Sequence, residues 1–141
     1  MTPRIALLRY ITLAAVVLIG TGCASRVQER DMNHLASALT KVSAAVDAKV
    51  RYENYPASAS SEELLNAVAQ VDPPLMKNFD GQVLRVLRQG EDSAVLLCEA
   101  GPGRALLEDA GCTAAMDVHR WSLAAPQRCE FTLNLKAVCG P

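Results

Sequence analysis

The first 22 residues limit what this chain can fold into, because we expect them to be removed before the rest folds. They begin with two positive charges, Arg4 and Arg9, and continue into an uncharged, largely apolar run from Tyr10 to Ser25. That run is 16 residues long, whereas a helix needs about 20 apolar residues to cross the hydrocarbon core of a bilayer. A positive start followed by a short apolar run is typical of a removable export signal.

The end of this segment, Gly20-Thr21-Gly22-Cys23, resembles the lipobox of bacterial lipoprotein signal peptides. The resemblance implies cleavage between Gly22 and Cys23, a diacylglyceryl thioether on Cys23, and acylation of the new amino terminus, for example with palmitate. In that family an Asp directly after the cysteine commonly retains the protein in the inner membrane. Here Ala24 and Ser25 follow, so the resemblance implies the periplasmic face of the outer membrane. An ordinary secretory signal, cut near Ala24, is the alternative.

Removal of residues 1–22 leaves 141 − 22 = 119 residues, enough for one domain. Arg4 and Arg9 leave with the signal, so the mature charge is 12 − 15 = −3, which argues against binding to nucleic acid or to an anionic membrane surface by charge. We expect residues 23–30 to form a lipidated tether and residues 31–141 a single small periplasmic domain. Its partners would be the lipid bilayer, through acylated Cys23, and a periplasmic protein.

Four cysteines remain after the acylated one: Cys98, Cys112, Cys129 and Cys139. An even number in an oxidising compartment predicts two disulfides, which would stabilise a domain with few aromatic residues. No C-x-x-C pair is present, so the spacing favours neither a metal site nor a redox-active thiol. We expect no cofactor.

The first part of the mature chain is predicted to be helical from residue 24 to about residue 53. Its apolar residues recur at helical spacing without an intervening proline or glycine. This stripe has two possible uses: packing on the domain's own sheet, which we favour, or pairing with another chain as a coiled coil, which requires more clean heptads than the chain offers. The residues of the stripe are Leu35, Leu39, Val42, Val46 and Val50, with Ala38 and Ala45 beside them.

A second helix is predicted after Pro56 and a short polar link. Ser60 and Glu63 have the spacing of a capping box. Asp72-Pro73-Pro74 ends this helix and caps a further turn through Phe79. The apolar face of the second helix is predicted to comprise Leu64, Leu65, Val68 and Val71.

The rest of the chain favours strands. Gln82 to Arg88 and Ala94 to Glu99 predict a hairpin, and we prefer a strand to a helical turn for Arg104 to Asp109. Thr113 to Arg128 is predicted to be an irregular loop. Apolar and polar residues alternate from Cys129 to Lys136, the pattern of a strand with one face inward.

An extended segment after Cys129 carries Cys139 away from it, so a bond between these two is disfavoured. We prefer Cys112 with Cys129 and Cys98 with Cys139. The predicted fold class is α+β: an N-terminal amphipathic helix and one or two short helices packed on one face of a small three- to four-stranded antiparallel sheet, stapled by disulfides.

No catalytic constellation accompanies this pattern. Glu108-Asp109 and residues 117–121 contain acid–base residue types, but no nucleophile, phosphate-binding loop or metal spacing is near them in the sequence. We therefore expect a non-enzyme. His119, Arg120 and Trp121 are the candidate partner-binding residues, since Trp and Arg are enriched in interface hot spots, although a sole tryptophan can also cap a core.

These observations favour a membrane-anchored periplasmic lipoprotein that binds a protein without catalysis, as an accessory of an envelope complex, an inhibitor or an immunity protein. The alternative is a structural envelope lipoprotein that oligomerises through its N-terminal helix. A small hydrolase is the third possibility.

Overall fold

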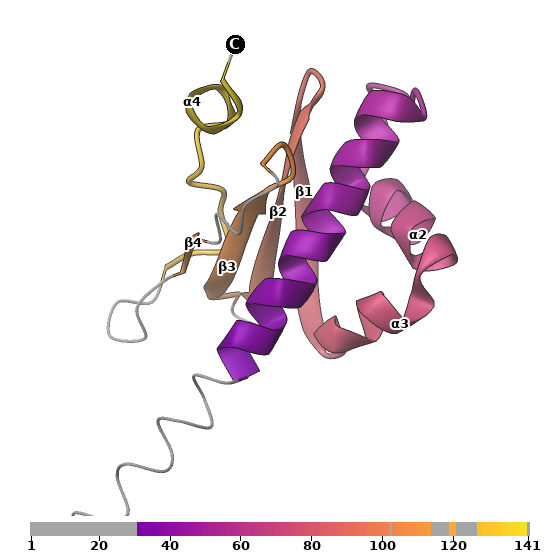
Figure 1. The fold of residues 1–141 in the computed structure, drawn as a ribbon. Helices are drawn as coiled ribbons and strands as arrows, with labels where there is room; N and C mark the ends of the chain where they lie inside the picture. Colours follow the sequence, from indigo (N-terminus) through magenta and orange to yellow (C-terminus); the bar gives the residue numbers. More distant parts are fainter. Residues whose placement is uncertain (1–30, 102, 114–118, 121–126, 141) are drawn as a thin grey trace, which may run out of the picture. The chain divides into compact units, whose positions relative to one another are not determined.

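The fold is α+β, as predicted, with helices packed against an antiparallel sheet in the strand order β1-β2-β3-β4 (Figure 1). A computed structural model describes residues 31–101, 103–113, 119–120 and 127–140. The chain divides into two compact units, Met1–His34 and Leu35–Pro141, and nearly all of the described residues belong to the second. Cys23 and the rest of the predicted signal and tether lie outside the described residues. In the part that is described, no helix is long and apolar enough to cross a membrane.

The N-terminal helix is described over residues 31–52 and runs across the sheet (Figure 1, purple). Leu39, Val42 and Val46 of its apolar stripe are fully buried. The stripe therefore packs within the chain, as the preferred interpretation predicted. Asn54, just past the helix, has a left-handed φ of 52°, a conformation that asparagine tolerates at helix ends better than most residues.

Two short helices and a 3₁₀ turn follow: α2 Ser61–Val71, α3 Pro73–Met76 and η1 Lys77–Phe79. The Ser60–Glu63 capping box is present, and the Asp72 side chain accepts from the backbone N–H of Leu75 at the start of α3. Both cap predictions are confirmed. Val71 was wrongly assigned to the buried face: it is 72 % exposed, because it is the last residue of α2.

The sheet consists of β1 Gln82–Gln89, β2 Asp92–Glu99, β3 Ala105–Ala110 and the two-residue β4 His119–Arg120. β1 and β2 form the predicted hairpin, and β3 is a strand, as preferred. The loop prediction for Thr113 to Arg128 missed β4, which pairs with Leu107 and Glu108 of β3. A two-residue strand is too short to leave a periodic signal in the sequence.

The outer edge of β1 is closed at one point by a side chain of α2. The Ser61 hydroxyl donates to the carbonyl of Val86 at 2.9 Å and accepts from its N–H at 3.0 Å. One hydroxyl thus satisfies both backbone groups that a further strand would have paired. Edge strands blocked in this way are poor templates for unwanted strand pairing.

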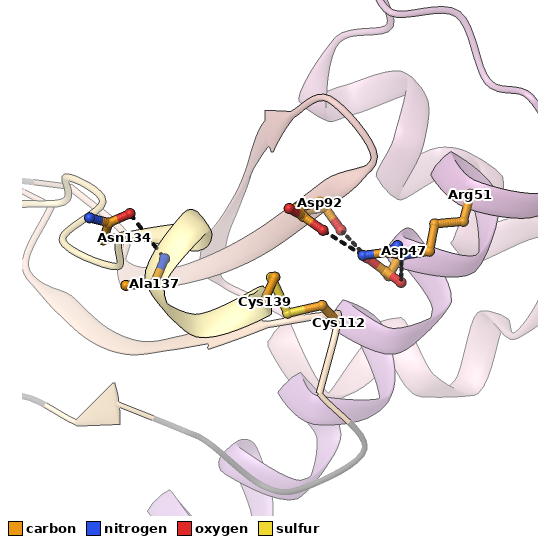
Figure 2. Close-up of a disulfide and its surroundings, with 8 residues drawn as sticks. Asp47, Arg51, Asp92, Cys112, Asn134, Ala137 and Cys139 are labelled. Carbon is orange, nitrogen blue, oxygen red and sulfur yellow. Dashed lines mark hydrogen bonds and ion pairs between the residues drawn. A yellow bond between two sulfur atoms is a disulfide. The ribbon is translucent and has the colours of Figure 1, made fainter. Parts of the chain in front are cut away.

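The predicted C-terminal strand was wrong. Residues 129–134 belong to no strand, and Leu135–Cys139 form a short helix, α4, capped by the Asn134 side chain on the N–H of Ala137 (Figure 2). Side chains from residue 129 to 135 do alternate between more buried and more exposed. The segment is therefore one-sided without forming a ladder. We call residues 127–140 the C-terminal strap.

The strap covers one face of the sheet and the N-terminal helix the other. Leu135 of the strap packs with Ala94 and Ala110, whereas Ser93 and Asp109, their neighbours along β2 and β3, contact the helix. Successive residues of a strand point to opposite faces, so neighbouring side chains along β2 and β3 contact the strap and the helix in turn.

The two disulfides join Cys98 to Cys129 and Cys112 to Cys139, with Cα–Cα distances of 5.8 and 5.6 Å. The presence of two bonds was predicted, but both preferred partners were wrong. The error followed from the strand assignment. From Cys129 onward the strap advances in the same direction as β3: Cys129 is bonded to Cys98 near the end of β2, beside the start of β3, and Cys139 is bonded to Cys112, just after the end of β3.

Candidate functional site

Two of the three predicted partner-binding residues, His119 and Arg120, lie at one edge of the sheet. His119 and Arg120 form β4, so the structure brings these two together against β3. Their side chains, and the whole of Trp121, lie outside the described residues. The structure therefore gives the backbone position of His119 and Arg120 in the sheet. The role of Trp121 stays a prediction.

The segment that carries these residues is held at both ends. Cys112 precedes it and is bonded to Cys139, and Cys129 follows it and is bonded to Cys98. Just before Cys129, the carbonyl of Gln127 accepts from the N–H of Ala105 at 3.0 Å. Residues 113–128 thus start and finish at covalently fixed points.

A buried carboxylate fastens the strap to the sheet. Glu108 of β3 is 0 % exposed. Its oxygens accept from the N–H of Thr132 at 3.0 and 3.2 Å, from the Thr132 hydroxyl at 2.8 Å and from the N–H of Leu133 at 3.1 Å. The Glu108 side chain thus accepts backbone N–H groups of the strap that a neighbouring strand would have bonded if the strap were the predicted strand.

A second polar cluster lies between the N-terminal helix and the sheet (Figure 2). The Asp47 carboxylate accepts from Arg51 Nε at 2.8 Å and from the Ser93 hydroxyl at 3.4 Å. Arg51 also bonds to Asp92 at the start of β2. The hydrogen bond with Asp47, with the charges of Asp47 and Asp92, raises the pKa of Arg51, so the guanidinium remains charged at any relevant pH.

The same interface includes the second acid of the Glu108-Asp109 pair. The Ser43 hydroxyl donates to the Asp109 carboxylate, and both residues are 1 % exposed. Glu108 and Asp109 therefore serve opposite faces of β3, one towards the strap and one towards the helix. Adjacent acids in a strand cannot act on one substrate, because their side chains point apart.

Gly111 permits this close packing of helix and sheet. A Cβ at this position would lie 2.4 Å from the carbonyl oxygen of Ser43 and 2.6 Å from the Cβ of Asp47. Helix backbone occupies the space where a side chain would stand. The sequence offered no signal for this contact beyond the glycine itself.

The contacts in these clusters favour a structural role, in which the carboxylates hold the strap and the N-terminal helix to the sheet. Their carboxylates each contact a donor on another element, and the described part of the chain contains no group of three residues suited to hold a metal ion. The acid–base residue types noted in the sequence, Glu108 and Asp109, are thus interior contacts between layers.

A groove of about 430 Å³ lies between the N-terminal helix and the α2–α3 segment. Small and apolar side chains form much of its lining, and charged side chains border it. Tyr52, which is 79 % exposed, lies on the same helical row as Ala45 and Ala48. The lining residues are Lys41, Ala45, Ala48, Lys49, Glu53, Val68, Val71, Asp72 and Leu75.

A comparison of the chain with known protein-family models, with curated protein sequences and with solved structures finds no match. The functional argument therefore depends on the residues and contacts described above.

Proposed function

We propose that this chain is a lipid-anchored protein at the periplasmic face of the outer membrane that binds a protein partner without catalysis. Two observations support export. The N-terminal segment resembles a lipoprotein signal ending at Cys23, and the four cysteines after it form two disulfides, bonds that persist in oxidising compartments.

The observation that carries the binding part is that the cysteines on both sides of residues 113–128 are disulfide-bonded, and that His119 and Arg120 between them pair with the sheet. A segment that is held at both ends before it docks has less conformational entropy to lose on binding than a free one. His119, Arg120 and Trp121 are the residues we assign to the contact.

The experiment is capture of envelope proteins by the purified full chain and by its Trp121→Ala variant. If Trp121 is a hot spot, the variant binds its partner more weakly by about 2 kcal/mol and keeps nearly the same thermal midpoint. Collapse of the fold, which removal of a buried Trp would cause at a cost of roughly 3 to 5 kcal/mol, would place Trp121 in the core instead. His119→Ala and Arg120→Ala then test the surface without Trp121.

The anchoring part has its own test. Cys23→Ala should block cleavage by the lipoprotein signal peptidase, so that the unprocessed precursor accumulates. Unchanged processing of this variant would refute the lipid anchor and leave the ordinary secretory signal as the better reading of residues 1–22.

The structural alternative, oligomerisation through the apolar stripe of the N-terminal helix, receives less support. Leu39, Val42 and Val46 are 0 % exposed within one chain, so this stripe has no free surface for a coiled coil. Self-association through this helix would have to use another of its faces.

A further inference from the structure

The two disulfides are interleaved along the chain. The cysteines follow one another as Cys98, Cys112, Cys129 and Cys139, and the bonds join the first to the third and the second to the fourth. Four cysteines allow three pairings, and in this one no cysteine is bonded to its neighbour in the sequence. The native bonds therefore cannot form by joining cysteines in the order in which they appear.

An unfolded chain favours bonds between neighbouring cysteines. Cys98 is 112 − 98 = 14 residues from Cys112 but 31 from its native partner Cys129. Cys139 is 139 − 129 = 10 residues from Cys129 but 27 from its native partner Cys112. Since the probability of loop closure falls with about the 3/2 power of loop length, the wrong neighbour is favoured about threefold for Cys98 and about fourfold for Cys139. A chain exported from its amino terminus also delivers Cys98 and Cys112 before Cys129 arrives.

A bond between Cys98 and Cys112 is incompatible with the sheet. Cys98 pairs with Ala105 at the start of β3, whereas Cys112 lies beyond Ala110 at the far end of that strand. These ends are about 17 Å apart at 3.3 Å per residue, and the Cα atoms of a disulfide lie within about 7 Å of each other. The neighbour bond therefore excludes the pairing of β2 with β3.

A bond between Cys129 and Cys139 would likewise displace the strap. The native bonds hold these two cysteines near opposite ends of β3, and the contact of Thr132 with Glu108 lies between them in the sequence. Joining Cys129 to Cys139 folds the strap back on itself, away from β3. Both neighbour bonds must therefore break before the fold is complete.

We infer that this chain is a client of a thiol–disulfide isomerase, which converts the bonds Cys98–Cys112 and Cys129–Cys139 into the native pairs. The inference rests on the export part of the proposed function, because the four cysteines must first be oxidised by a disulfide oxidant, which takes up two electrons for each bond formed. It goes beyond that function, because it names a second protein partner that acts during maturation.

The exchange consumes neither oxidant nor reductant. A thiolate of the isomerase attacks the sulfur of Cys98, forms a mixed disulfide with it and releases the Cys112 thiolate. The Cys112 thiolate attacks the sulfur of Cys139, which forms the native Cys112–Cys139 bond and releases the Cys129 thiolate. The Cys129 thiolate then attacks the mixed disulfide at Cys98, which forms the native Cys98–Cys129 bond and returns the isomerase thiolate.

Oxidative refolding of the full chain tests the inference. The protein, purified in detergent, is reduced and unfolded in urea and then diluted into diamide, which oxidises thiols without supplying a free thiol. Peptide mapping without reduction should find the neighbour bonds in excess of the native bonds by about threefold or more. Addition of reduced protein disulfide isomerase should convert them to Cys98–Cys129 and Cys112–Cys139. An isomerase that lacks the second cysteine of its active site should remain joined to the chain as a mixed disulfide.

Two double variants provide the matched controls. C98A/C129A and C112A/C139A each retain one native pair and no neighbour bond within the four. Each should form its single bond in diamide alone, with no effect of the isomerase.

The inference is overturned if the native pairs form in full yield in diamide alone, or if the double variants depend on the isomerase as strongly as the native chain does. Neither result would affect the lipid anchor or capture of a partner through His119 and Arg120. Failure here is therefore distinguishable from failure of the proposed function.

Discussion

Replacement of Glu108 by Ala should release the strap from the sheet and destabilise the fold. The variant leaves three donors without their acceptor: the N–H and hydroxyl of Thr132 and the N–H of Leu133. Hydrogen bonds to charged groups contribute about 1.5 to 3 kcal/mol each. Thr132 is exposed and Leu133 partly exposed, so water can bond to the donors that lose Glu108. We therefore take the loss of stability as about 1 kcal/mol per donor. The expected loss is about 3 kcal/mol.

The assay is urea unfolding followed by circular dichroism, with both disulfides intact. A loss of about 3 kcal/mol corresponds to a fall in the thermal midpoint of roughly 12 °C for a domain of this size.

Glu108→Gln, which keeps one acceptor oxygen, should cost about half as much. Glu130→Ala is the matched control, because Glu130 is largely exposed and its ion pair with Arg128 is long at 3.9 Å; it should stay within about 0.5 kcal/mol of the native chain. A loss below about 1 kcal/mol for Glu108→Ala would refute the fastening role.

Three further predictions concern single positions. Gly111→Ala should cost about 3 kcal/mol in urea unfolding, since its Cβ would overlap the backbone of Ser43; a neutral variant would disprove the close approach. The backbone N–H of Ser60, and to a smaller extent its hydroxyl, lower the pKa of Glu63. The stability that Glu63 contributes should therefore be present above the ordinary carboxyl pKa and be lost as the pH falls through the lowered pKa of the folded state. An NMR titration of Glu63 checks the direction of the shift, and a raised pKa would contradict it. Ser61→Ala should cost about 1 kcal/mol and speed amide exchange at the outer edge of β1, and unchanged exchange there would count against it.

The parts of the fold that could be predicted from sequence are those specified by neighbouring residues. Ser60 with Glu63, and Asp72 before Pro73, are complete chemical units within four residues, so both caps were found. The stripe of the N-terminal helix and the β1–β2 hairpin are likewise local patterns. Each was predicted because its hydrogen bonds are made within the segment or to the next one.

The strap could not be predicted in this way. Alternation from Cys129 to Leu135 correctly indicated a one-sided segment, but a sequence pattern does not say what satisfies the backbone N–H groups. Here the acceptor is the side chain of Glu108, 24 residues earlier for Thr132. The wrong disulfide partners followed from the same assignment, since they were chosen to suit a strand.

The candidate site was only partly accessible from sequence. Glu108 was noticed, but as an acid–base residue type, because nothing in the sequence distinguishes a catalytic carboxylate from one that holds a buried loop. His119 and Arg120 were assigned to an irregular loop, whereas they form β4 and pair with β3. The groove depends on the packing of α2 and α3 beside the N-terminal helix, which no local pattern specifies.

The most direct test of this account is mass spectrometry of the protein purified from the cell envelope without reduction. We predict a chain that begins at an acylated Cys23, contains no free thiol, and yields the linked peptides Cys98–Cys129 and Cys112–Cys139. A chain that begins elsewhere, or that carries four free thiols at these positions, would contradict the proposal that this is an exported, lipid-anchored and disulfide-stapled binding protein.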